Sequence, residues 1–491
     1  MNKRIVFVLV IYLITCLIYG LNRTPFYDEA HAYTISQLSF FEIFQVTKSE
    51  GHCALWYILL KIFCPNLNHY PYNMQIFNWI IYCFLTIFFW LKSPFNTAIK
   101  TIILLTYPFL HFYATVSRPY GLCVLVLFAL TYLYKEKIKQ HPYFFAALLF
   151  ICSQLGIMTL IGASVFYLLF LYDSIKINKT DKKTILLVSS IFIFGTLLFL
   201  AQVFNTNIEQ MRDVEQIVGF YEDFTKFIYA PFLINQNTNY CQLFFNLVCC
   251  ILFYSVAIVF FKKNKTSFLF ILLTSFLMSF FFFNFYIGSF WHYFFYIIYL
   301  IIAYWIGYDD LKNYNFLNRL LILFLILLTI PYSLFTYGFS WETSHAYYYK
   351  TLINEVLKID TKNSKIFCLD YYSPFSAGTL PYLTQKNIVI HDMLGNPLNS
   401  VESLKMTFKF RNKPLDFKTF VSKLDKNKKN YLVNQATNLE LRCLDATKVK
   451  IVKGEGFTYS ENDTTLFFKI VSFIDERSFA IYEIKVMNDK K

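Results

Sequence analysis

Long apolar runs that alternate with short basic clusters constrain this chain more than any other feature of its sequence. A helix crosses a bilayer with about 17 to 25 predominantly apolar residues. Runs of this kind occur at approximately 4–21, 73–91, 98–116, 119–135, 142–158, 160–175, 183–203, 242–261, 267–285, 287–308 and 317–339. The sequence therefore predicts an α-helical polytopic membrane protein with about eleven transmembrane helices.

Composition agrees with this class and argues against the alternatives. Of the 491 residues, 56% are hydrophobic and 15% are charged, which is too apolar a balance for a soluble chain of this length. The formal net charge of +14 comes from basic clusters between apolar runs, not from one aromatic-studded polar face, so we expect no nucleic-acid partner. The 11 Cys show no paired metal-ligand spacing.

Basic residues are distributed unevenly between alternate connections, and cytoplasmic loops are the ones that retain Lys and Arg. The richer set contains Lys3, Arg4, Lys92, Lys100, Lys135, Lys137, Lys139, Lys176, Lys179, Lys182, Lys183, Lys262, Lys263, Lys265, Lys312 and Arg319. The poorer set contains Arg23, Lys48, Lys61, Arg118, Arg212 and Lys226. This predicts a multi-pass protein of the plasma or inner membrane with a cytoplasmic N-terminus. No small-residue cleavage site precedes Tyr19, so we expect the first helix to be retained.

Three regions on the predicted outer side are too long to be turns: 22–72, 204–241 and the C-terminal region from about 340. In the first, Ser36–Val46 and Ala54–Phe63 have the length and character of helices that lie in the membrane interface. We therefore expect a transmembrane domain over 1–340 and an extracytoplasmic mixed α/β domain over 341–491. Its β-prone runs are Lys365–Asp370, Asn387–His391, Asn430–Asn434, Lys448–Val452, Thr465–Val471 and Ala480–Val486.

The sharpest chemical feature is Tyr27-Asp28-Glu29-Ala30-His31, soon after the first apolar run. Two adjacent carboxylates near a membrane are costly if they face lipid. One interpretation is a solvated loop in which Asp28 caps the following helix; the other is a functional acidic site. The same Asp-Glu-Ala-His letters occur in a helicase motif, but the chain has no G-x-x-x-x-G-K-[ST] loop for nucleotide phosphates.

The order of these features resembles the C superfamily of membrane glycosyltransferases, especially the protein O-mannosyltransferases and bacterial aminoarabinose-type transferases. The likeness covers about residues 1–340: one N-terminal helix, an Asp-Glu pair, interfacial helices and many further spans. Gly51-His52-Cys53-Ala54-Leu55-Trp56-Tyr57 is similar to the family's His-Pro-Pro-Leu-Tyr-like helix start, without its two prolines. Ser117-Arg118-Pro119-Tyr120 and Trp291-His292-Tyr293 resemble basic outer ends of later spans.

The resemblance implies a glycosyltransferase that moves a sugar from a polyprenyl-phosphate carrier to an acceptor hydroxyl at the outer face, with inversion. It implies that Asp28 and Glu29 are the catalytic residues, with Asp28 as the base. Arg118 and His292 are the expected ligands of the donor phosphate. His31, His52 and Tyr120 are expected to support the site. The partners are then the lipid-linked donor and a glycan, lipid or protein acceptor, with no nucleotide cofactor.

Several alternatives stay open from the residues alone. Glu29 orients Asp28 or binds a divalent ion with His31, His52 or His111, although scattered histidines are usually structural, so no metal site is assigned. A transporter or flippase of lipid-linked glycans would carry charges at mid-membrane sites. A glycan polymerase or ligase, and a scaffold for the C-terminal domain, are further rivals. Cys53 with Cys64, and Cys368 with Cys443, are either disulfides or, as we favour, free thiols.

Overall fold

In the computed structural model, the chain forms a series of helices followed by a sheet. The described residues are 3–23, 25, 27–50, 52–137, 141–177, 181–203, 240–285, 290–331, 353–368, 382–392, 395, 397–398, 417–435, 449–452, 456–461, 464–473 and 479–487. By its internal contacts the chain divides into two units. The first unit comprises residues 1–20, 44–56 and 77–338, and the second unit comprises 21–43, 57–76 and 339–491.

Helices occupy each of the eleven predicted apolar runs within the described residues. They are α1 (Lys3–Asn22), α5 (Tyr72–Lys92), α6 (Thr97–Leu105), α7 (Tyr120–Tyr132), α8 (Pro142–Leu155), α9 (Ile157–Ile177), α10 (Lys182–Val203), α13 (Tyr240–Lys263), α14 (Lys265–Asn284), α15 (Phe290–Ile306) and α17 (Asn315–Pro331). Of these, α1, α5, α9, α10 and α14 are long and apolar enough to cross a membrane. The chain is therefore a helical membrane protein, while eleven spans and their orientation stay predictions.

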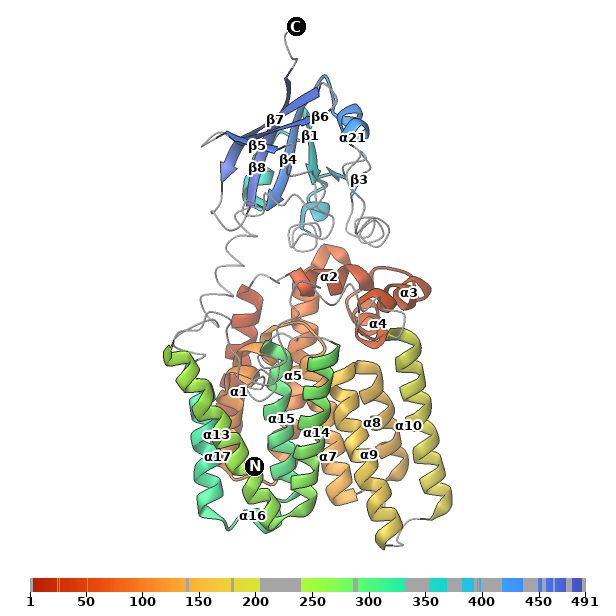
Figure 1. The fold of residues 1–491 in the computed structure, drawn as a ribbon, viewed down its shortest axis with the longest axis vertical. Helices are drawn as coiled ribbons and strands as arrows, with labels where there is room; N and C mark the ends of the chain where they lie inside the picture. The colour runs from red at the N-terminus through yellow and green to blue at the C-terminus, as the bar shows by residue number, and fades with distance from the viewer. Residues whose placement is uncertain are drawn as a thin grey trace. The chain divides into compact units, whose positions relative to one another are not determined.

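Large apolar side chains on the outer surface of these helices agree with a bilayer environment. Phe7 on α1 is 66% exposed and Phe194 on α10 is 61% exposed, and Phe84, Phe144 and Phe276 are similarly uncovered. Monomeric soluble proteins rarely leave so much apolar surface in water. In the first unit the helices run alongside one another, with α8 packed on α9 and α10 (Figure 1).

Two features interrupt the helices where the local sequence requires it. The apolar run 98–116 is not one continuous α-helix, because Pro108 follows the end of α6 and opens the π-helix η2 (Pro108–Tyr113). Between α8 and α9 the chain turns at Gly156, whose φ of +139° suits glycine. The Thr159 hydroxyl donates a hydrogen bond to Cys152 O (2.6 Å), which closes this tight turn.

Short helices lie between α1 and α5. They are α2 (Tyr27–Ser36), α3 (Phe40–Glu50), α4 (Ala54–Phe63) and the 3-10 helix η1 (Leu67–His69). The bounds of α4 match the predicted helix, and α3 is shifted a few residues past the predicted Ser36–Val46. The remaining helices are the π-helix η3 (Leu133–Lys137), α16 (Tyr308–Leu311) and α21 (Phe417–Lys423). That α3 and α4 lie in the membrane interface stays a prediction.

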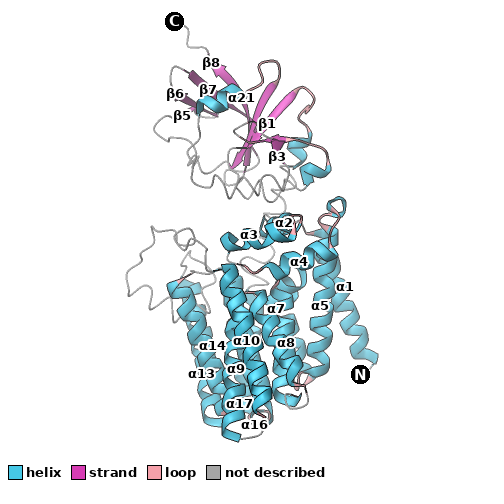
Figure 2. Cartoon of the chain, turned by 90° about the vertical axis from the view of Figure 1, so that its right-hand side faces the viewer, coloured by secondary structure: helices cyan, strands magenta, loops and turns pink. Residues whose placement is uncertain are grey.

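The C-terminal region forms an eight-stranded sheet, drawn in magenta in Figure 2. Its strands are β1 (Ser364–Cys368), β2 (Ile390–His391), β3 (Pro397–Leu398), β4 (Lys429–Gln435), β5 (Val449–Val452), β6 (Gly456–Glu461), β7 (Thr464–Phe473) and β8 (Phe479–Met487). The strand order is β3-β2-β1-β4-β8-β7-β6-β5. β1 pairs in parallel with β2 and β4, and the other pairs are antiparallel. The mixed α/β expectation is thus met, apart from β3 and β6, which the sequence analysis did not predict.

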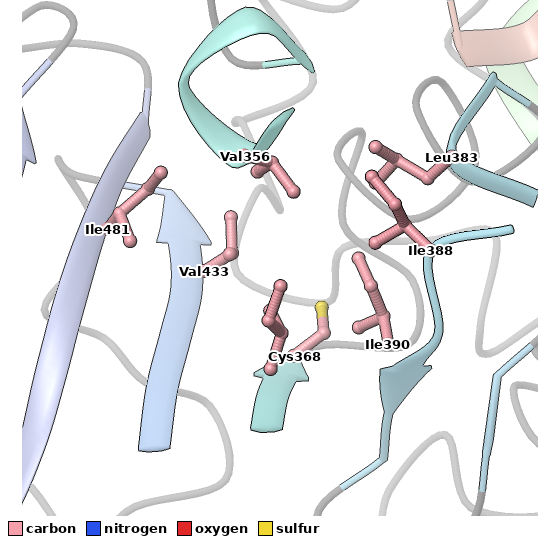
Figure 3. Packing of buried hydrophobic residues seen from close by; sticks show 8 residues of the cluster. Val356, Cys368, Leu383, Ile388, Ile390, Val433 and Ile481 are labelled. Atoms are coloured by element: carbon pink, nitrogen blue, oxygen red, sulfur yellow. The ribbon is translucent and has the colours of Figure 1, made fainter. Parts of the chain in front are cut away.

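One face of this sheet carries a compact apolar core. Successive side chains of a strand point to opposite faces, so residues that pair across strands share a face. Ile366 pairs with Ile390, and Cys368 pairs with Val433, which in turn pairs with Ile481. The buried members of the core are Val356, Ile366, Cys368, Leu383, Ile388, Ile390, Val433 and Ile481, and Figure 3 shows them converging.

This core predicts a contrast between two leucines of the C-terminal region. Leu383 is fully buried, so Leu383→Ala should destabilise the sheet by about 2–5 kcal/mol through lost burial and a cavity. Leu357 is 43% exposed, so Leu357→Ala should cost no more than about 0.5 kcal/mol. Hydrogen exchange of β1 and β4 in the full-length protein measures both. Equal protection in the two variants would show that Leu383 is not part of the core.

Candidate active site

The Asp28-Glu29 pair lies in the first turn of α2. Carboxylates in the first helical turn interact favourably with the helix dipole. The helix begins one residue before Asp28, so Asp28 is inside the first turn instead of at the cap position that its residue type suggested. His31 lies three residues further along α2 and is half-buried. Residues at this spacing share one face of a helix, so Asp28 and His31 lie on the same face.

Glu29 forms a buried ion pair with Arg23. Arg23 Nη2 lies 2.6 Å from Oε1 and 2.7 Å from Oε2 of Glu29, and the two side chains are 5% and 0% exposed. A carboxylate buried this deeply requires a positive partner, because removing it from water is costly. The solvated-loop interpretation is therefore wrong for Glu29. Asp28, the adjacent residue, is only half-buried.

Arg23 is a site residue that sequence analysis counted only as an outer-side charge. Its backbone carbonyl accepts a hydrogen bond of 2.8 Å from Gln75 Nε2 on α5, which fixes the turn between α1 and α2. The signal in the sequence was an arginine six residues before a glutamate, at the end of an apolar run. Nothing local in that spacing shows that the two side chains meet.

Three tyrosines of the second unit pack against one another near the acidic pair. Tyr33 of α2 donates to Asn66 O (3.0 Å), and its ring centroid lies 4.8 Å from that of Tyr70. Tyr70 in turn packs edge-on against Tyr382 at 5.1 Å. Gln385 Nε2 donates to Tyr70 O at 2.9 Å. Residues 382–385 of the C-terminal region therefore contact Tyr70, which packs on the helix that carries the acidic pair.

The environment of these hydroxyls disfavours their ionised form. Burial raises the pKa of Tyr70 well above its ordinary value, and the nearby carboxylate of Glu29 raises it further. Burial, followed by the charge of Glu29, also raises the pKa of Tyr382. Burial raises the pKa of Tyr33 to about 12. All three tyrosines are thus neutral near neutral pH.

Arg118 and His52, both predicted site residues, are brought together in the first unit. Arg118 Nη2 lies 3.0 Å from His52 Nε2, and Arg118 is 5% exposed. A guanidinium has only donors, so His52 accepts through Nε2 and its ring is neutral in this contact. A positive guanidinium is thereby held in a fixed orientation just before α7.

Tyr120 and His292 form a second contact between predicted residues. Tyr120 Oη lies 3.3 Å from His292 Nε2, and their rings meet edge-on at 5.9 Å. Tyr120 begins α7 and His292 lies in the first turn of α15, so this contact joins the two helix starts. His292 is 6% exposed. Because Tyr120 is two residues after Arg118, one short junction supplies both contacts.

The predicted site residues are thus divided between the units. Asp28, Glu29 and His31 belong to the second unit, and His52, Arg118, Tyr120 and His292 belong to the first. Among the described residues, no three His, Cys, Asp or Glu side chains are grouped to hold a metal ion. Cys53, Cys64 and Cys368 are free thiols, and Cys443 lies outside the described residues.

Comparison with known proteins gives no relative on which to base a function. No protein family, curated protein or solved structure matches the chain. The functional argument therefore depends on the residues and their geometry.

The Arg23–Glu29 pair predicts a large effect of neutralising one partner. Glu29→Gln removes the charge that Glu29 places beside the buried Arg23 guanidinium, and breaking a buried ion pair in this way typically costs about 3–5 kcal/mol. Removing both charges together, as Arg23→Met with Glu29→Leu, should restore most of that loss. The measurement is the rate at which detergent-purified protein loses its monodisperse gel-filtration peak on heating.

A matched control exists in the same unit. Lys358 and Glu355 form an ion pair in which Lys358 is 69% exposed, so Glu355→Gln should cost at most about 1 kcal/mol. A Glu29→Gln protein as heat-resistant as Glu355→Gln would contradict a structural role of the buried pair.

Proposed function

We propose that this protein is a glycosyltransferase that moves a sugar from a polyprenyl-phosphate carrier to an acceptor hydroxyl at the outer face of a membrane. The apolar helices supply the membrane-embedded body that a lipid-linked donor requires. The distribution of Lys and Arg supports an orientation with a cytoplasmic N-terminus and an extracytoplasmic C-terminal domain. The donor carries its own activated phosphate, so the reaction needs no nucleotide cofactor.

The observation that carries the proposal is the difference in burial between two adjacent carboxylates. Glu29 is fully buried and neutralised by Arg23, whereas Asp28 is half-buried in the same helical turn. The buried pair anchors the start of α2, and the turn presents Asp28 at a partly accessible position. A carboxylate held by a rigid support in this way suits general-base chemistry.

In the proposed reaction, Asp28 accepts the proton of the acceptor hydroxyl. The acceptor oxygen forms a bond to the anomeric carbon as the bond from that carbon to the phosphate oxygen breaks. The electron pair of the broken bond leaves with the lipid phosphate, and direct displacement inverts the anomeric centre. Only the sugar is transferred, so the reaction needs no oxidant and no cofactor.

Arg118 is the proposed partner of the departing phosphate. Charge-assisted hydrogen bonds to phosphate are stronger than neutral ones, and developing negative charge strengthens them further. The contact with His52 holds the guanidinium without neutralising its charge. His292, held by Tyr120, is proposed as the second phosphate ligand.

The first test is Asp28→Asn. The amide keeps the shape of the side chain but has no basic site, so transfer should fall by about 10²–10⁴-fold. Stability should change by no more than about 1 kcal/mol, the usual contribution of a charge in the first helical turn. Turnover of radiolabelled polyprenyl-phosphate sugars is measured at matched amounts of folded protein. Wild-type turnover by this variant would remove Asp28 from the mechanism.

The second test separates charge from geometry at Arg118. Arg118→Ala should weaken donor use by about 1.5–3 kcal/mol, the usual contribution of a hydrogen bond to a charged group. Arg118→Lys should recover only part of the loss, because an ammonium lacks the forked donor geometry. The readout is the KM for the lipid-phosphate donor. An unchanged KM in Arg118→Ala would exclude this residue from donor binding.

A further inference from the structure

Two glutamines are buried in the first unit, although glutamine is usually exposed. Gln154 lies at the end of α8 and is 7% exposed, and Gln202 lies at the end of α10 and is 4% exposed. Gln202 Nε2 donates to Gln154 Oε1 at 2.8 Å. Gln154 Nε2 donates to Gly195 O at 2.8 Å. Buried amides are costly unless they are hydrogen-bonded, so this pair is a built feature of the fold.

The close approach of α8 and α10 makes the pair possible. A Cβ atom added at Gly195 would lie 2.5 Å from Ser153 Oγ and 2.9 Å from a ring carbon of Phe150. Only glycine fits there, and small residues of this kind allow neighbouring helices to pack closely. The amide of Gln154 reaches the Gly195 carbonyl across this contact.

The side-chain oxygen of Gln202 binds the first residue of α4. Gln202 Oε1 accepts a hydrogen bond of 2.9 Å from the backbone N–H of Ala54. Ala54 is the first residue of α4, and the first four N–H groups of a helix have no partner within it. Next to it, Cys53 Sγ lies 3.7 Å from Ser153 O and is almost fully buried. Residues 53 and 54 are therefore fixed to the ends of α8 and α10.

His52 directly precedes this fixed point, and it is the residue that accepts from Arg118. We infer that Gln154 and Gln202 are positioning residues that hold His52, and through it the Arg118 guanidinium, in the geometry that receives the donor phosphate. The inference rests on the proposed function for the role of Arg118. Gln202 donates to Gln154 and accepts from the N–H of Ala54, and Ala54 lies two residues after His52. All of these residues, and Arg118, belong to the first unit.

The sequence at this point supports the same view. The glycosyltransferase motif that His52-Cys53-Ala54 resembles has prolines where this chain has Cys53 and Ala54. A proline stiffens the backbone but has no N–H. Here the N–H of Ala54 is present, and it donates a hydrogen bond to Gln202 Oε1 of α10.

The test is Gln202→Leu in the full-length protein, with Thr196→Val as the control. Thr196 is on the same helix, and its hydroxyl donates to Phe192 O within that helix. The first readout is maleimide labelling of Cys53, quantified by mass spectrometry. Burial raises the pKa of the Cys53 thiol to about 12, so this thiol should react slowly in the wild type.

We expect Cys53 labelling in Gln202→Leu to rise about tenfold or more, because local opening exposes the thiol. The second readout is kcat/KM for a radiolabelled polyprenyl-phosphate sugar, which should fall about tenfold to a hundredfold as the phosphate ligands shift. Thr196→Val should change neither. Unchanged Cys53 labelling in Gln202→Leu would overturn the inference.

Ala54→Pro provides a second test that survives misfolding of Gln202→Leu. Proline suits the first position of a helix, but it removes the N–H that Gln202 binds. Ala54→Pro alone should therefore reduce kcat/KM, because Gln202 is still present. The double variant Ala54→Pro with Gln202→Leu should have a restored kcat/KM and slow labelling of Cys53. A kcat/KM of Ala54→Pro equal to that of the wild type would contradict the positioning role.

The outcomes also separate this inference from the proposed function. Faster labelling of Cys53 with unaltered transfer would show that the glutamines hold the loop but that the loop does not hold the donor, which overturns the inference. A wild-type protein that uses no lipid-phosphate donor would defeat the proposed function and with it the role given to Arg118.

Discussion

Polar groups in apolar surroundings must find partners within the protein, and this constraint shapes every part of the structure. It makes the apolar runs helical, because a helix satisfies its own backbone groups. It also explains the buried polar contacts, namely Arg23 with Glu29, Arg118 with His52 and Gln154 with Gln202. Each of these contacts lies at or near the end of a helix, where backbone groups and side chains lack partners along the helix itself.

The Arg23–Glu29 pair gives the acidic segment its chemical asymmetry. Two neighbouring carboxylates in water would be nearly equivalent, but burial beside a guanidinium commits Glu29 to holding the turn. Asp28 is half-buried on the helix that this pair anchors. The contact of residues 382–385 with Tyr70 adds a role for the C-terminal region, which helps to pack the same segment.

Periodicity and length were sufficient to predict much of the fold. The apolar runs, the helix Ala54–Phe63 and most strands of the C-terminal sheet follow from local patterns of hydrophobic residues. The break at Pro108 was visible in the sequence as a proline in an apolar run, but the run was interpreted as continuous. β3 has only two residues, and β6 begins with Gly456 and mixes polar with aromatic residues, so neither carries a strong strand pattern.

The candidate site was predictable only in part. Residue types with obvious chemistry, such as Asp28, Arg118 and His52, were recognisable from their motifs. The residues that hold them were not, because Gln202 is separated from Ala54 by 148 positions and its bond is a product of the tertiary fold. Arg23 was overlooked for a related reason, since its pairing depends on the turn between α1 and α2 and not on a motif.

The central claim is that a sugar moves from a polyprenyl phosphate to an acceptor hydroxyl. The most direct measurement supplies purified protein in liposomes with a panel of radiolabelled polyprenyl-phosphate sugars, in parallel with nucleotide sugars, and with membranes lacking the protein as the acceptor source. The account predicts label in an acceptor only from a lipid-phosphate donor, with the anomeric configuration inverted. Label that crosses the bilayer while still on its lipid, with no transfer from any donor, would contradict it and identify a transporter.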